Sequence, residues 1–82
     1  MDFETYVRIH EDDSPMVLLN LLVETLKSHG DNRVSRSDAY ARGNKDDEEY
    51  YNHECQHMMR RAKWLYEKLT KIVEDKNCNA NI

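Results

Sequence analysis

The chain has 82 residues, of which 39% are hydrophobic and 34% charged, and its formal net charge is −4. This length allows one small domain, residues 1–82, and the hydrophobic content is too high for a disordered chain. The lack of a basic excess disfavours nucleic acid as a partner, and two glycines with one proline disfavour a β-fold with many turns.

The first segment, residues 1–13, has a pattern that suits either a strand or a helix. A strand would explain the alternation of Phe3, Thr5, Val7 and Ile9. A helix would place on one face Phe3, Tyr6, Val7 and His10. Because no second strand is visible to pair with the first, we expect a short helix.

A long helix is predicted to begin at Ser14-Pro15. Serine caps the free amides of a first helical turn, and proline at the next position lacks an amide that would need a partner. We expect this helix to cover about residues 15–29 and to end at Gly30, which favours the left-handed conformation of helix termini. Its apolar residues cover nearly the whole circumference, so the helix needs burial on more than one side.

Residues 31–45 are polar and are predicted to contain only a brief helical turn. Ser35-Arg36-Ser37-Asp38 resembles a capping box, and Gly43 would end the turn. A second long helix is expected over about residues 46–75, with its acidic first turn stabilised by the helix dipole. The polar residues 77–82 are expected to form a flexible tail.

One apolar stripe on the second long helix indicates what this helix packs against. Its members are spaced alternately four and three residues apart: Tyr51, Cys55, Met58, Ala62, Leu65, Leu69 and Ile72. The fold class is therefore all-α, an antiparallel helical hairpin. The first helix would span roughly 20 Å and the second roughly 45 Å, so much of the stripe would remain uncovered.

A second copy of the chain would cover the rest of the stripe, and we expect an oligomeric helical bundle, a homodimer or higher. The predicted oligomer core consists of Leu19, Leu22, Leu26, Tyr51, Cys55, Met58, Leu65, Leu69 and Ile72.

The cysteines and the apolar segments predict the compartment. Cys55 and Cys78 would lie too far apart along one helix to form a disulfide, and no secretory signal is evident. The apolar stretch 16–26 is interrupted by Asn20 and Glu24 and is too short to cross a bilayer. We expect a cytoplasmic protein without membrane contact.

The sequence His53-Glu54-Cys55-Gln56-His57 matches the zincin pattern, in which two histidines bind zinc and the glutamate acts as general base. The stripe, however, places His53 and His57 on the outer side of the helix. A third ligand is also missing, since Lys63 stands where similar families carry histidine. A zinc hydrolase is therefore the least favoured hypothesis, and we predict no metal and no cofactor.

The outer face of the second helix is a better candidate for a binding site, because a tryptophan lies there among cations. The predicted contact residues for a protein partner or an anionic ligand are His57, Arg60, Arg61, Trp64, Lys68 and Lys71. Trp64 either packs against the first long helix or residues 31–45, or belongs to an exposed binding patch.

These patterns predict a small non-enzymatic regulatory or inhibitory protein that acts through protein–protein interaction as a homo-oligomer. The alternative is a binder of an anionic small ligand such as a nucleotide, held by the same basic residues.

Overall fold

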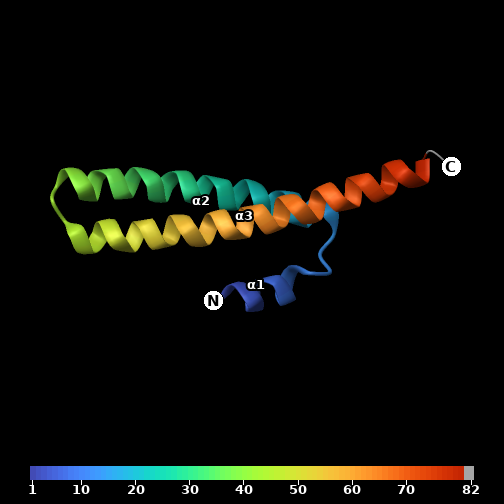
Figure 1. Cartoon of the computed structure of the whole chain (residues 1–82), viewed down its shortest axis with the longest axis horizontal. Coiled ribbons are helices and arrows are strands. Elements are labelled where there is room, and N and C mark those ends of the chain that lie inside the picture. The colour runs from blue at the N-terminus through green and yellow to red at the C-terminus, as the bar shows by residue number, and fades with distance from the viewer. Residues whose placement is uncertain (81–82) are drawn as a thin grey trace.

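The computed structural model describes residues 1–80, and the side-chain surroundings of residues 1–75. It contains three helices, α1 (Phe3–His10), α2 (Pro15–Ala41) and α3 (Lys45–Ala80). The long helices α2 and α3 form an antiparallel hairpin, and α1 packs against the middle of α3 (Figure 1). The molecule measures 59 × 23 × 14 Å, with a radius of gyration of 16.2 Å. A compact domain of this length has a radius of gyration of about 12 Å, so the fold is elongated. The predicted all-α hairpin is confirmed.

The N-terminal segment forms a helix, as expected, and not a strand. Asp2 caps α1 by accepting a hydrogen bond of 2.8 Å from the backbone amide of Thr5. This bond lowers the pKa of the Asp2 carboxyl below its ordinary value. At the other end, His10 Nδ1 lies 2.7 Å from Asp13 Oδ2, which joins the last turn of α1 to the link before α2.

The start of α2 agrees with the sequence prediction, but its end does not. Pro15 is the first helical residue, and Ser14 Oγ accepts a hydrogen bond of 3.4 Å from the amide of Val17. The predicted end at Gly30 is wrong, because α2 continues without a break to Ala41. The brief turn predicted within residues 31–45 is therefore mostly the second half of α2.

Packing against α3 explains why the helix passes through Gly30. Positions seven residues apart on α2 face α3 on both sides of this glycine: Leu18, Thr25 and Ala39 are buried and Asn32 is half-buried. A glycine inside a helix costs about 1 kcal/mol relative to alanine, which such contacts readily offset. Beyond Gly30, Arg36 also donates a hydrogen bond of 2.9 Å to the Asn52 side chain of α3.

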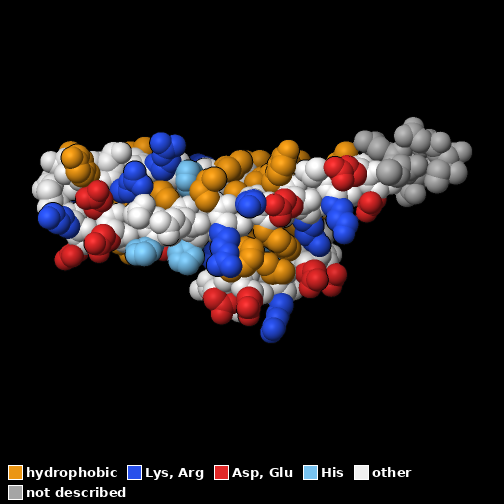
Figure 2. Space-filling model, viewed as in Figure 1, with side chains coloured by type: hydrophobic (Ala, Val, Ile, Leu, Met, Phe, Trp, Pro, Cys, Tyr) orange, Lys and Arg blue, Asp and Glu red, His pale blue; other side chains and the backbone are white. Residues whose placement is uncertain are grey.

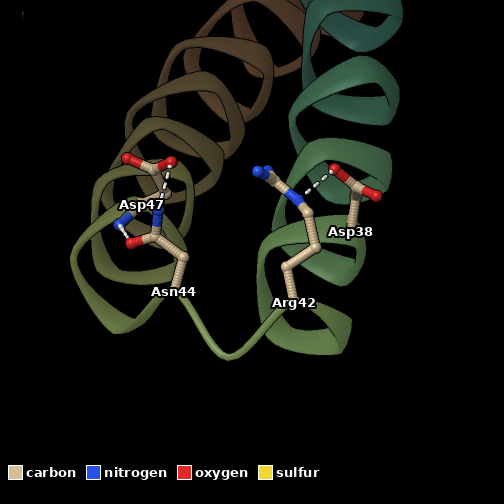
Figure 3. A network of polar contacts seen from close by, with 4 residues as sticks. All are labelled: Asp38, Arg42, Asn44 and Asp47. Atoms are coloured by element: carbon tan, nitrogen blue, oxygen red, sulfur yellow. Dashed lines mark hydrogen bonds and ion pairs between the residues drawn. The ribbon is translucent and has the colours of Figure 1, made fainter.

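The turn between the long helices is stabilised from both of its ends (Figure 3). Gly43 adopts the left-handed conformation, with φ 73°. The amides of Gly43 and Asn44 donate hydrogen bonds of 3.0 and 2.9 Å to the carbonyl oxygens of Tyr40 and Ala39. Asn44 caps α3, since its Oδ1 accepts a hydrogen bond of 3.2 Å from the Asp47 amide.

The lengths of the two helices alter the argument for a second chain. α2 has 27 residues, roughly 40 Å, and α3 has 36, roughly 54 Å. The mismatch is therefore smaller than the sequence predicted, and only the C-terminal part of α3 extends past α2 (Figure 1). The backbone of α3 is helical to Ala80, beyond the predicted end at residue 75. The flexible tail at 77–82 stays a prediction, since residues 81–82 lie outside the described residues.

The core is small and lies where all three helices meet. Tyr6, Leu18 and Leu65 are buried together, and Leu21, Leu22, Trp64, Leu69 and Ile72 pack around them. Cys55 and Ala62 are buried along the same side of α3. Within the described part of the chain, no helix is long and apolar enough to cross a membrane.

Candidate protein-binding surfaces

The basic outer face predicted on α3 contacts α1. The guanidinium carbon of Arg60 lies 4.4 Å from the centre of the Phe3 ring, and that of Arg61 lies 4.6 Å from the centre of the Tyr6 ring. Arg61 Nη2 also donates a hydrogen bond of 3.3 Å to the carbonyl oxygen of Met1. Two of the predicted binding residues therefore hold the N-terminal helix of their own chain through cation–π contacts.

Trp64 is half-buried at the centre of this contact. Its ring meets the Tyr6 ring edge-on, with 6.1 Å between centroids, and Lys68 Nζ lies 5.7 Å from the centre of the indole. Of the two alternatives raised by the sequence, packing describes Trp64 better than an exposed patch. The aromatic partner comes from α1, which the sequence pattern did not connect with this face.

The two remaining members of the predicted face, His57 and Lys71, are exposed. We name the group formed by Arg60, Arg61, Trp64 and Lys68 the α1-binding face. Figure 2 shows hydrophobic side chains between α1 and α3, with Lys and Arg side chains beside them on α3 and acidic side chains on the outer part of the N-terminal segment. The sequence signal for this pairing is the spacing of Phe3, Tyr6 and His10, which places all three on one side of α1.

The zincin-like motif lies at the surface. His53 and His57 are exposed and Glu54 is half-buried. Among residues 1–75, whose side chains are described, no group of three or more His, Cys, Asp or Glu lies close enough together to hold a metal ion. The third ligand missing from the sequence pattern is therefore not supplied by the fold of these residues.

Cys55, inside the same motif, points inward. It is buried and unbonded to another cysteine, and its Sγ lies 3.9 Å from the carbonyl oxygen of His29 on α2. It therefore packs as a small apolar core residue, as the stripe predicted.

A second surface is apolar and lies along both long helices. We name it the lateral face. It consists of Leu19, Leu22, Val23 and Leu26 of α2 with Met59 and Tyr66 of α3. Leu26 is 50% exposed and Tyr66 63% exposed. A shallow groove of about 450 Å³ runs between the helices here, lined by Leu22, Leu26, Met59, Arg60, Ala62, Lys63 and Tyr66.

Some residues of the predicted oligomer core are buried within one chain, and others are exposed. Leu65 and Cys55 are buried within one chain, and Tyr51, Met58, Leu69, Ile72 and Leu22 are half-buried. Leu19 and Leu26 are exposed on the lateral face. This last pair, with Met59, Val23 and Tyr66 beside it, offers an apolar surface to a second chain.

The two surfaces are turned away from each other but meet at Arg60. Successive helical residues are turned by about 100°, so Tyr66 and Trp64 are separated by roughly 200° around α3. Arg60 stacks on Phe3 and also lines the lateral groove, so it belongs to both surfaces.

Comparison of the chain with protein-family models, with curated proteins and with solved structures found no match.

Proposed function

We propose that this is a small non-enzymatic binding protein that acts through protein–protein contacts as a homodimer, with a regulatory or inhibitory role. The observation that carries the dimer is the exposure of the lateral face. Leu19, Val23 and Leu26 of α2 and Met59 and Tyr66 of α3 are each between 46% and 63% exposed.

Exposed apolar side chains that cluster on one face of a small protein are typical of an interaction site. The lateral face supplies the chemistry, since apolar side chains from two adjacent helices form one continuous surface. Pairing two hairpins through this face would make a four-helix bundle, in which these leucines become core residues.

The non-enzymatic part of the proposal is supported by the placement of the reactive side chains. The two histidines of the zincin-like motif face outward, whereas a hydrolytic zinc site needs a third ligand and a cleft for substrate. The large surface features are an apolar groove and a basic face with aromatic contacts. Both are features of protein recognition.

Sedimentation equilibrium tests the dimer. The wild-type chain is expected to sediment at about twice 9.8 kDa at micromolar concentration. Tyr66→Lys should shift it to the monomer, because a charge cannot be buried unpaired in an apolar interface. Tyr50→Lys is the matched control, since Tyr50 is 59% exposed and lies about 160° away around α3. A wild-type monomer, or equal dissociation by both substitutions, would refute the proposal.

A further inference from the structure

α1 is too short to be a stable helix on its own. It has eight residues, whereas isolated helices shorter than about 12 residues are marginal in water. Tyr6 is its one buried side chain, Phe3, Val7 and His10 are half-buried, and Ile9 is exposed. Its helical state therefore depends on the contacts that it makes with α3.

Those contacts belong to a recognition surface with a clear chemical preference. Two arginines stack on two aromatic rings that are three residues apart on α1, and the buried tyrosine meets Trp64 edge-on. Beneath them lie Leu18 and Leu65, both fully buried. An aromatic anchor in a pocket flanked by arginine is typical of the energetic centre of a protein interface.

The charges of the α1-binding face also favour an acidic partner. Residues 1–14 carry five carboxylates, Asp2, Glu4, Glu11, Asp12 and Asp13, against one arginine. The α1-binding face itself contains three cations, Arg60, Arg61 and Lys68, and no carboxylate. The face therefore attracts an acidic segment, and α1 with its acidic link is such a segment.

We propose that the α1-binding face is a receptor for an acidic amphipathic helix of a partner protein, with aromatic side chains three residues apart, and that α1 is its built-in competitor. The inference rests on the proposed function, because it names the chemistry of the protein partner. Its test is separate from that of the dimer, because docking is followed by Trp64 emission and the dimer by sedimentation.

The competition has a simple physical basis. α1 remains tethered by residues 11–14, so it is always present at high effective concentration. It is nevertheless displaceable, because its docking depends on a single buried side chain and on cation–π contacts at the surface. A partner helix that makes the same contacts over a greater length would replace it and leave the α2–α3 hairpin intact.

Trp64 gives a direct measurement of docking, because it is the single tryptophan of the chain and contacts Tyr6. The test uses the full chain with Phe3→Ala and Tyr6→Ala, which we name the open variant. Circular dichroism should show that α2 and α3 persist. Trp64 emission should move to longer wavelength than in the wild type, because the indole becomes more exposed.

The probe is a synthetic peptide of residues 1–14, which contains no tryptophan. It should bind the open variant saturably and return Trp64 emission toward the wild-type wavelength. Its affinity for the wild-type chain should be at least about tenfold lower, since α1 then occupies the face in most molecules. The same peptide with Phe3→Ala and Tyr6→Ala should not bind.

A matched pair of substitutions tests the arginine contact in the open variant. Arg61→Gln should weaken peptide binding about three- to tenfold, because a cation–π contact and a hydrogen bond are lost. Lys63→Gln removes the same charge from a position that lines the lateral groove and should change binding less than twofold. Equal weakening by both would show a general charge effect and overturn the specific contact.

Four further outcomes would overturn the inference. The first three are no saturable binding of the peptide to the open variant, equal affinity for the open variant and the wild type, and an unchanged Trp64 emission in the open variant. If the open variant unfolds, Phe3→Ala alone is titrated instead, since it keeps the buried Tyr6. A dimer that dissociates on opening would show that α1 docks on a second copy, which refutes competition within one chain.

Discussion

The two glycines of the chain are expected to respond in opposite ways to the same substitution, alanine. Gly30 lies in the middle of α2 with a negative φ, and a Cβ atom added there would meet nothing within 4 Å. Gly43 lies in the turn with φ 73°, also with open space around it. The difference between the two sites is therefore one of backbone conformation and not of crowding.

The magnitudes follow from these conformations. Gly30→Ala should raise the free energy of unfolding by about 1 kcal/mol, the difference between glycine and alanine inside a helix. Gly43→Ala should lower it by about 1–2 kcal/mol, because an L-residue is strained in the left-handed region. For a domain of this size, each kcal/mol moves the melting temperature by about 4–8 °C.

Urea and thermal unfolding followed by far-ultraviolet circular dichroism would measure both variants against the wild type. The measurement is made at two protein concentrations, so that a change in self-association is separated from a change in helix stability. Each variant is the control for the other. If Gly30→Ala destabilises as much as Gly43→Ala, then α2 ends at Gly30 and the reasoning from the long helix is refuted.

Three other substitutions test the core, the turn and the cap of α1. Leu65→Ala should lower the free energy of unfolding by about 2–5 kcal/mol, since it leaves a cavity at a fully buried site. The control Val34→Ala, at a side chain that is 71% exposed, should change it by less than about 0.5 kcal/mol. Equally small effects of both substitutions in urea unfolding would contradict this core. Asn44→Ala should cost about 1 kcal/mol in the same assay, because the α3 cap bond to the Asp47 amide is lost, and no change would argue against that cap. The pKa of Asp2 is lower in the folded chain than in the unfolded chain, so the ionised carboxylate stabilises docked α1. This stabilisation is complete above the unfolded-state pKa and is lost below about pH 4, as pH falls through the folded-state pKa. Acrylamide quenching of Trp64 should therefore rise in acid in the wild type, and the same profile in Asp2→Asn would count against a role for this carboxylate.

Most of the secondary structure could be predicted from short-range patterns. Ser14-Pro15 marks the start of α2, and the alternating spacing of four and three residues marks the inner side of α3. These signals are local, because capping and helix periodicity involve residues only a few positions apart. The buried state of Cys55 and the outward direction of His53 and His57 followed from the same periodicity.

The end of α2 could not be predicted in this way. Two local features favour an end at residue 30, whereas packing against the distant helix α3 favours continuation. Gly30 and the polar residues after it resemble a helix end. The repeat of seven residues from Leu18 through Thr25 and Asn32 to Ala39 crosses Gly30. It can be recognised as the buried side of α2 only when the position of α3 is known. Tertiary packing outweighs a propensity cost of about 1 kcal/mol.

In the candidate sites, too, some features follow from local sequence and others only from tertiary packing. By itself the sequence determined that Arg60, Arg61, Trp64 and Lys68 share one side of a helix, since that depends on spacing alone. Only the tertiary structure decided that α1 covers this side and that the apolar surface left open is the lateral face. The reason is physical: periodicity establishes which side chains point the same way, whereas the contact between helices distant in sequence depends on how whole surfaces fit in shape and charge.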